Sequence, residues 1–319
     1  MRLLAPLLLL AACSTATDKD ADTDAVDTDA VDSDTADTAD TDAEPDTLDP
    51  AEAITVSEVP VGELSCLPAA GTWLTQTVDA SCIKTVPVQG EVTDFESGDG
   101  VDGLTVEMFF GDEITGTPDI TMTSADGGKV SGASAPTCTA WASRVTLPGD
   151  ADTKPAIQFH WSEPFADPMD SFYNSVDAGT IQLISALLGI ELDATKGVVA
   201  GTAYDCGGEG SEFQGVQVLA RNAAGVYPAS QQPRYFLDEF PSRVATATSE
   251  DGLWLIGGLE PGDYVVEMWA VPAAGQAARV IGQTKLEVFA DSLTIADVYT
   301  GSEDGVVFPD ECTAPCAAP

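Results

Sequence analysis

Residues 248–264 read Thr-Ser-Glu-Asp-Gly-Leu-Trp-Leu-Ile-Gly-Gly-Leu-Glu-Pro-Gly-Asp-Tyr, and this stretch decides the fold. The Asp-Gly pair at 251–252 favours a tight turn, because glycine tolerates the positive φ that such turns require. Large apolar residues fill 253–256, so both faces of the strand predicted there are apolar. The Pro-Gly pair at 261–262 predicts a second turn that sends the chain back as a neighbouring strand.

The same landmarks occur earlier in the chain and in the same order, which indicates two copies of one module. Each copy has a strand with a Gly followed four residues later by an Asp, then a second Gly before an apolar segment, then an Asp-Gly turn. The matched stretches are 88–94 with 199–205, 103–106 with 215–218, and 123–127 with 248–252; Pro136 and Pro261 each follow nine residues after the turn glycine.

The landmarks of the second copy resemble the carboxypeptidase regulatory-like, or transthyretin-like, β-sandwich. The resemblance covers roughly residues 197–300 and, more loosely, 84–160. It implies an accessory, adhesive or spacing module without catalytic residues. The first copy departs from the pattern, because Lys129 and Ser131 stand where the second copy has Trp254 and Ile256, and Cys138 stands at the position of Asp263. The strand pairing of the first copy therefore stays open.

Period-two alternation in other segments, separated by turn residues, predicts an all-β protein of two tandem antiparallel β-sandwiches. Between them, Ile181, Ile184, Leu187 and Leu188 have helical spacing, with Asp177 or Thr180 as N-cap and Gly189 as the C-terminal stop. The predicted division is a signal peptide (1–12), a lipidated Cys with a disordered tether (13–53), the first module (54–160), a connecting segment with a short helix (161–196), the second module (197–304) and a Cys-containing tail (305–319).

The N-terminus has a basic residue and a short apolar run, as in a cleaved export signal. Leu10-Ala11-Ala12-Cys13 resembles the lipobox of bacterial lipoproteins, which implies cleavage before Cys13 and lipidation of its sulfur. Acyl chains anchor a protein firmly to a membrane. Ser14 is not the Asp associated with inner-membrane retention in enteric bacteria, so the resemblance implies an outer-membrane lipoprotein, with the periplasmic or extracellular face left open. The alternative is an ordinary secretory signal with an accidental Cys.

The formal net charge is −41, from 53 acidic and 12 basic residues. Residues 14–53 carry −14 of it, and their Asp/Thr/Ala composition predicts a disordered, self-repelling tether. Such a tether lacks the Gly and the bidentate acid of a calcium loop. The rest of the chain is also strongly acidic, which argues against nucleic acid as a partner and against adsorption to anionic lipid head groups.

The six cysteines after Cys13 are Cys66, Cys82, Cys138, Cys206, Cys312 and Cys316. An even number in an exported chain predicts up to three disulfides, with fifteen connectivities open. Three precede the central segment and three follow it, so complete pairing needs an odd number of bridges between the halves. We favour Cys66–Cys82, Cys138–Cys206 and Cys312–Cys316; a zinc site is the alternative, although no second Cys pair matches 312–316.

Enzymatic motifs are absent from the sequence: there is no Gly-x-Ser-x-Gly elbow, His-Glu-x-x-His helix or phosphate-binding Gly-rich loop. The alternative to a non-enzymatic protein is a secreted metal-dependent or hydrolytic enzyme with a site around His160, Glu163 and Asp167. Glu163, Asp167 and Asp170 are candidate calcium ligands, but two prolines and the lack of a glycine turn argue against a preformed loop. We expect no cofactor, with calcium as the open alternative.

The remaining candidate site is an aromatic-rich insertion of the second module, residues 227–241. Its rings could contact a glycan or an envelope protein if they are exposed on a rigid sandwich, or they could pack in the core. The expected function is therefore a non-catalytic, membrane-anchored envelope or cell-surface lipoprotein that presents β-sandwich modules for binding or adhesion. The candidate partner-binding aromatics are Tyr227, Tyr235, Phe236 and Phe240.

Overall fold

The computed structural model describes residues 47–74, 76–111, 113–147, 153–160, 167–208 and 210–313. This part of the chain is nearly all β, as predicted, with α-helices α1 (Pro50–Ala53) and α2 (Ala178–Leu188) and short 3-10 helices η1 (Ala80–Cys82) and η2 (Asp310–Cys312). The strands are β1 (Thr85–Asp94), β2 (Thr105–Phe110), β3 (Ile120–Thr123), β4 (Lys129–Pro136), β5 (Trp141–Thr146), β6 (Thr153–Lys154), β7 (Ala156–His160), β8 (Met169–Asp177), β9 (Gly197–Tyr204), β10 (Gln217–Asn222), β11 (Gln232–Leu237), β12 (Phe240–Ser242), β13 (Leu253–Leu259), β14 (Gly262–Ala270), β15 (Arg279–Val288), β16 (Leu293–Ala296) and β17 (Val298–Tyr299).

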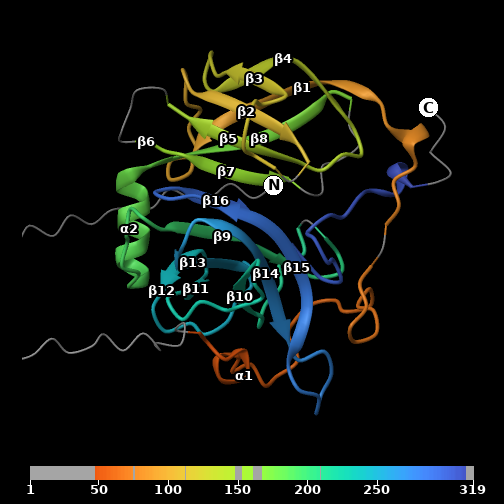
Figure 1. Cartoon of the computed structure of the whole chain (residues 1–319), viewed down its shortest axis with the longest axis vertical. Coiled ribbons are helices and arrows are strands. Elements are labelled where there is room, and N and C mark those ends of the chain that lie inside the picture. The colour runs from red at the N-terminus through yellow and green to blue at the C-terminus, as the bar shows by residue number, and fades with distance from the viewer. Residues whose placement is uncertain are drawn as a thin grey trace, which may run out of the picture.

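The strands form three sheets stacked as layers (Figure 1). A four-stranded sheet, β4-β1-β8-β6, lies at the top, and a three-stranded sheet, β10-β14-β15, lies in the lower half. Between them runs a ten-stranded sheet in the order β12-β11-β13-β9-β16-β7-β5-β2-β3, with β17 paired to β9. One hydrophobic core fills each of the two spaces between layers.

The two copies of the module have the same strand pairing, which confirms the repeat. In the first copy (β1–β8), β1 pairs antiparallel with β4 and parallel with β8. In the second copy (β9–β17), β9 pairs antiparallel with β13 and parallel with β16. The partner sheets, β2-β5-β7 and β10-β14-β15, are antiparallel throughout. Each copy is therefore a β-sandwich.

The copies are fused through the middle sheet. β16 of the second copy pairs parallel with β7 of the first, with Leu293 opposite Ala156. The predicted β-sandwich architecture is confirmed, but the prediction of purely antiparallel strands misses the pairs β1–β8, β16–β9, β16–β7 and β17–β9. Parallel partners need long connections. Here almost a whole module separates β1 from β8, and β9 from β16, so local sequence patterns do not reveal the pairing.

The stretch that predicts the fold lies where the two cores meet. In β13, Trp254 and Ile256 belong to the core under the three-stranded sheet, and Leu255 belongs to the core under the four-stranded sheet. All three are buried. Gly252 has φ +66, as its turn requires, and the backbone N–H of Leu253 donates to the Asp251 carboxylate at 3.0 Å. The strand that the sequence predicts to be apolar on both faces is therefore buried on both sides.

The register of the first copy differs from the sequence alignment by one residue. In β4, Val130 lies opposite Gly90, as Trp254 lies opposite the equivalent Gly201 in β13. Val130, not Lys129, therefore occupies the position of Trp254, and a second turn glycine, Gly128 with φ +84, accounts for the shift. In the partner sheets, Trp141 lies opposite Phe110 as Tyr264 lies opposite Asn222, so Trp141 is the equivalent of Tyr264. Cys138 lies three residues before Trp141 and therefore does not occupy the position of Asp263.

The single predicted helix between the copies is confirmed as α2. The Asp177 side chain accepts from the N–H of Thr180 at 2.8 Å, and Gly189 ends the helix in the left-handed conformation with φ +71. Leu188 and the following Ile190 are buried in the core under the four-stranded sheet. The helix therefore packs at the junction of the two sandwiches.

The first described residues, 47–66, form a strap along the second copy. Thr47 bridges to Pro228, the N–H groups of Thr55 and Val56 donate to the Gln217 side chain, and Val61 bridges to Gln214. The C-terminal segment, residues 308–313, instead contacts the stretch that leads into β1 of the first copy. The Asp79 N–H donates to the carbonyl of Cys312, and the Phe308 N–H donates to the Gln76 side chain. Residues 47–66 thus contact the second copy, although the predicted division places 47–53 in the tether and 54–66 in the first module.

Two disulfides fix these terminal segments: Cys66–Cys206 joins the strap to the second copy, and Cys138–Cys312 joins the first copy to the C-terminal segment. Cys82 is also disulfide-bonded. The favoured pairs Cys66–Cys82 and Cys138–Cys206, and with them Cys312–Cys316, are therefore wrong. The physical reason is that residues close in sequence diverge to opposite copies, so the bridges join distant segments.

Several predictions fall outside the described residues. These are the signal peptide, Cys13, the tether up to residue 46, Glu163 and Cys316. Within the part that the structure describes, no helix is both long and apolar enough to cross a membrane.

Candidate functional site

The aromatic-rich insertion covers the edge of β10 with its side chains. The Tyr235 hydroxyl accepts from the N–H of Val218 at 3.0 Å. The Gln231 amide makes two bonds to Ala220, accepting from its N–H at 2.9 Å and donating to its carbonyl at 3.0 Å. An uncovered edge strand can pair with another chain, so these side chains protect the sheet.

Three of the four candidate partner-binding aromatics therefore serve the fold. Tyr235 is buried, and desolvation raises the pKa of its hydroxyl well above the usual range. Tyr227 is half-buried and donates to the Glu267 carboxylate at 2.6 Å; desolvation and this bond raise its pKa. Phe236 is half-buried against the core under the four-stranded sheet. The prediction required exposed rings, and of these four residues Phe240 alone, at 58% exposed, meets that requirement.

Phe240 lies at the tip of the β11–β12 hairpin, opposite Leu237. The two turn residues between them, Asp238 and Glu239, have φ +51 and +67, the signs of a type I′ hairpin turn. That conformation normally selects Asn-Gly or Asp-Gly, because a side chain at positive φ is strained. The Asp251 carboxylate accepts from the Glu239 N–H at 2.8 Å and braces the turn.

Exposed apolar side chains gather on this hairpin and on the adjacent helix α2, which contacts β12. We call this set the hairpin surface; its members and exposures are Leu183 (37%), Leu187 (44%), Leu237 (46%), Phe240 (58%) and Val244 (82%). Apolar residues scattered singly on a surface need no explanation, whereas contiguous exposed patches are typical of interaction sites, which makes this group on two contacting elements a candidate.

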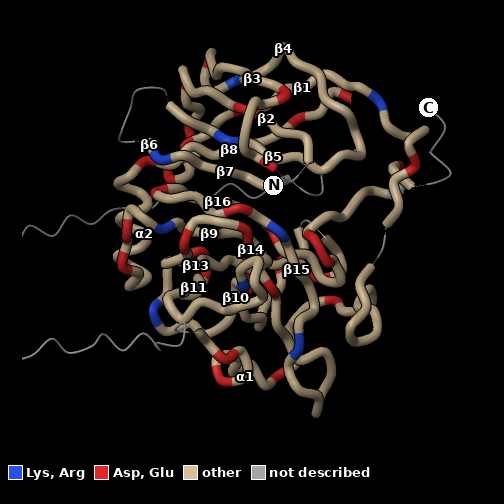
Figure 2. The backbone as a smooth tube through the Cα atoms, in the orientation of Figure 1, with Lys and Arg blue, Asp and Glu red and all other residues tan. Residues whose placement is uncertain are grey.

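Two arginines fix the helix beside the hairpin. The Arg243 side chain donates to the carbonyls of Ala186 and Leu187, and Arg234 donates to the carbonyl of Leu188. These carbonyls belong to the last turn of α2, whose partial negative charge favours a cation. Both arginines are thus engaged by the fold, while the acids Asp238 and Glu239 stay exposed at the tip. Figure 2 shows that acidic positions are spread over the body and outnumber basic ones.

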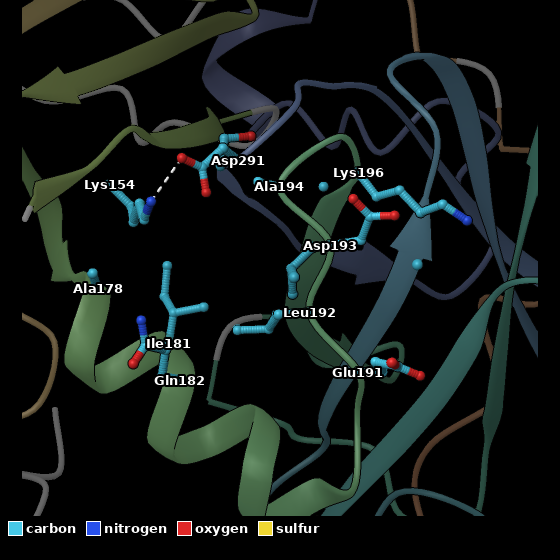
Figure 3. A pocket seen from close by; sticks show the side chains of 14 residues that line it. Lys154, Ala178, Ile181, Gln182, Glu191, Leu192, Asp193, Ala194, Lys196 and Asp291 are labelled. Atoms are coloured by element: carbon cyan, nitrogen blue, oxygen red, sulfur yellow. Dashed lines mark hydrogen bonds and ion pairs between the residues drawn. The ribbon is translucent and has the colours of Figure 1, made fainter. Parts of the chain in front are cut away.

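A pocket of about 400 Å³ lies beside α2 on the side of the four-stranded sheet (Figure 3). Ile181 and Leu192 contribute apolar side chains, and Lys154 forms a 2.6 Å ion pair with Asp291 at the rim. Hydrogen bonds from the Thr195 backbone and side chain lower the pKa of Asp193.

A second hollow, of about 500 Å³, lies where the loop between β2 and β3 of the first copy, which contributes Glu113, meets β14 and β15. It is lined by Glu113, Asp263 and Glu287, with Lys285 among them. Desolvation and the neighbouring acids Asp263 and Glu113 raise the pKa of Glu287. Across the described residues, no group of three His, Cys, Asp or Glu side chains has the geometry to hold a metal ion.

The alternative enzyme site lies only in part within the described residues. His160 ends β7, but its side chain and residues 161–166, including Glu163, lie outside the described residues. Asp167 and Asp170 are exposed near the start of β8. The structure thus leaves calcium binding and catalysis at this place as untested predictions.

No family model matches the chain, and no curated protein matches it significantly. Among solved structures, the shaft pilin SpaA from Lactobacillus rhamnosus GG is 11% identical, with a TM-score of 0.22 over 70% of this chain and 100% of the pilin. The minor pilin GBS52 from Streptococcus agalactiae is 10% identical, with a TM-score of 0.20 over 66% of this chain and 95% of its own. The Bacillus anthracis TIE protein is 10% identical, with a TM-score of 0.20 over 68% of this chain and 34% of its own. Such scores carry no argument about function.

Proposed function

We propose that this protein is a non-catalytic bacterial envelope lipoprotein, anchored through Cys13, whose fused β-sandwiches present a surface for binding a protein or a glycan. The observation that carries the proposal is the hairpin surface, in which Leu237, Phe240 and Val244 are exposed on a body stabilised by disulfides between distant segments. Disulfides are typical of exported proteins, and binding residues commonly lie on loops held by a rigid scaffold.

Anchoring rests on the resemblance of residues 10–13 to a lipobox, and it is tested at the N-terminus. Mass spectrometry of the protein extracted from membranes should find a terminus at Cys13 that carries acyl chains. Cys13→Ser should release the protein from the membrane fraction. Ser14→Asp is the matched control, because it should keep the lipid and change only the membrane. An unmodified terminus elsewhere in the chain would refute the anchoring.

Binding is tested with the purified mature chain on a glycan array and against isolated envelope proteins, with and without calcium. We expect at least one partner whose binding weakens when Phe240 is replaced by Ala. Phe172→Ala is the matched control, because Phe172 is a similarly exposed phenylalanine (55%) on β8 of the other copy. If neither glycan nor protein binds under either condition, the adhesive function is excluded.

A further inference from the structure

The hairpin surface combines exposed apolar side chains with an acidic tip. Leu237 and Phe240 form the last pair of the β11–β12 hairpin, and the two acids of the turn stand between them. The tip is therefore an apolar pair around two negative charges.

The conformation of the turn is held in place despite its cost. Both Asp238 and Glu239 have positive φ, and glycine at the second position would adopt it without strain. The bond from the Glu239 N–H to Asp251 fixes the strained residue, and the ladder from Tyr235–Ser242 to Leu237–Phe240 holds the stem. Backbone strain that the surroundings maintain is typical of functional sites.

The charges near the tip define the kind of partner. Glu250 and Asp251 add two acids in the chain segment that braces the hairpin, so four acids stand against two cations, Arg234 and the exposed Arg243, which remain charged while they donate to carbonyls at the end of α2. A surface that is acidic and apolar is complementary to a cationic and apolar one. Aromatic and arginine side chains are the residues that most often dominate such contacts.

We propose that the β11–β12 hairpin docks on a protein segment in which lysine or arginine side chains flank aromatic or aliphatic residues. The apolar pair Leu237 and Phe240 supplies the buried contact, and Asp238 and Glu239 pair with the cations of the partner. The inference rests on the proposed binding function and names its partner class. It differs from glycan binding, in which the acids at the tip would have no cationic partner.

The test uses the purified mature protein and a phage-displayed library of random peptides, followed by titration of synthetic peptides. We expect the enriched peptides to contain Lys or Arg beside aromatic or aliphatic residues. Phe240→Ala should weaken their binding about 30-fold, as for a central apolar anchor. Phe172→Ala should leave the affinity within about twofold, since it lies on the other copy.

The double variant Asp238→Asn with Glu239→Gly separates charge from folding. Asn-Gly is the preferred type I′ pair, so the hairpin should keep its shape while losing both charges. We expect about tenfold weaker binding at low salt, and a smaller difference at high salt, because salt screens exposed charges.

The outcomes distinguish this inference from the function on which it rests. Enriched peptides that are acidic or neutral, or whose binding Phe240→Ala leaves unchanged, would overturn the hairpin as the docking site while a binding function elsewhere survives. Failure to enrich any peptide would also overturn it, and failure on the glycan array and against envelope proteins as well would remove the proposed function.

Discussion

The two copies of the module share one pattern of strand pairing but differ in what covers their equivalent sheets. In the first copy, the outer face of β4-β1-β8 is mostly polar, with Ser131 and Gln89 exposed and Phe172 as an exposed apolar residue among them. In the second, the equivalent face of β13-β9-β16 contributes Leu255 and Val198 to a core. The same topology therefore serves as an outer layer in one copy and as the middle layer in the other.

The difference shows that the composition of one strand face decides how a copy is used. Polar residues on the outer face of β4 leave it in water, whereas a second apolar face on β13 must be buried, here against the helix and the first copy. Fusion of the sandwiches follows from this second apolar face. Changes at equivalent positions of the two copies should therefore differ in a predictable order.

The largest contrast is expected between Trp254→Ala and Val130→Ala, the residues that lie opposite Gly201 and Gly90. Truncation of the buried Trp254 should lower the free energy of unfolding by about 4 kcal/mol, because it leaves a large cavity. Val130→Ala should cost about 2 kcal/mol, since fewer buried carbon atoms are lost. Urea unfolding with the disulfides intact measures both. A neutral Val130→Ala would contradict the revised register, which places Val130 at the buried position opposite Gly90.

Loss of the Cys66–Cys206 disulfide should have the next largest effect. The double Ser variant should be destabilised by about 3 kcal/mol, because the bridge closes a long loop. The sequence separation is 140 residues. Hydrogen exchange should rise at the N–H groups of Thr55 and Val56, which hold the strap on the second copy. The matched variant without Cys138–Cys312 should leave these two amides protected; similar exchange in both variants would contradict a local role.

Gly90→Ala and Gly201→Ala should behave alike, since both glycines face the parallel neighbour strand of their own copy. A Cβ atom would lie 2.1 Å from the carbonyl oxygen of Ser171 at Gly90, and 1.9 Å from that of Ala296 at Gly201. Each substitution should cost about 2 kcal/mol through displacement of a strand. Thermal unfolding measures it, with Ser131→Ala as a surface control. A neutral result at either glycine would break the equivalence of the copies.

The smallest effect concerns Glu287, at the hollow between the copies. Its pKa is raised in the folded state, mainly by desolvation, so its contribution to stability is present below the unfolded value near 4.3 and is lost as pH rises through the folded pKa. Because the side chain is largely solvated, Glu287→Gln should change the free energy of unfolding by less than about 0.5 kcal/mol at pH 7. Urea unfolding at pH 4 and pH 7 should show a smaller pH-dependent loss in the variant, and a larger loss would reverse the assigned sign.

Local patterns predicted much of the fold. The Asp-Gly turn at 251–252, the two-sided strand after it and the capped helix before Gly189 each follow from neighbouring residues, and each is found as expected. The parallel pairs and the disulfide partners depend on contacts between residues at least 81 positions apart, the separation of Val88 and Met169, and no local pattern specifies such contacts. The extra turn residue Gly128 was hidden because the sequence alignment matched the two Asp-Gly pairs, at 126–127 and 251–252, and each is followed nine residues after its glycine by a proline.

The candidate site was predicted less well, for a related reason. The insertion was identified by its aromatic residues, yet Tyr235 is used to cover a strand edge, and exposure depends on tertiary packing. The apolar members of the hairpin surface on α2, Leu183 and Leu187, were not predicted as part of a site. Their helical spacing resembles that of core residues such as Leu188, and the sequence alone does not tell these apart.

The strap determines how the molecule would carry mechanical tension. A pull on the chain before Thr47 first loads the short hydrogen-bonded contacts at Pro228, Gln217 and Gln214, which can open one after another. Peeling then stops at Cys66, where a covalent bond passes the force directly to Cys206 at the end of β9. A pull applied between the N-terminal strap and the second copy therefore does not load residues 67–84 or the first copy. Figure 1 places α1 at the opposite end of the long axis from β4. The second copy therefore bears such a load, and the first copy lies on its far side without tension.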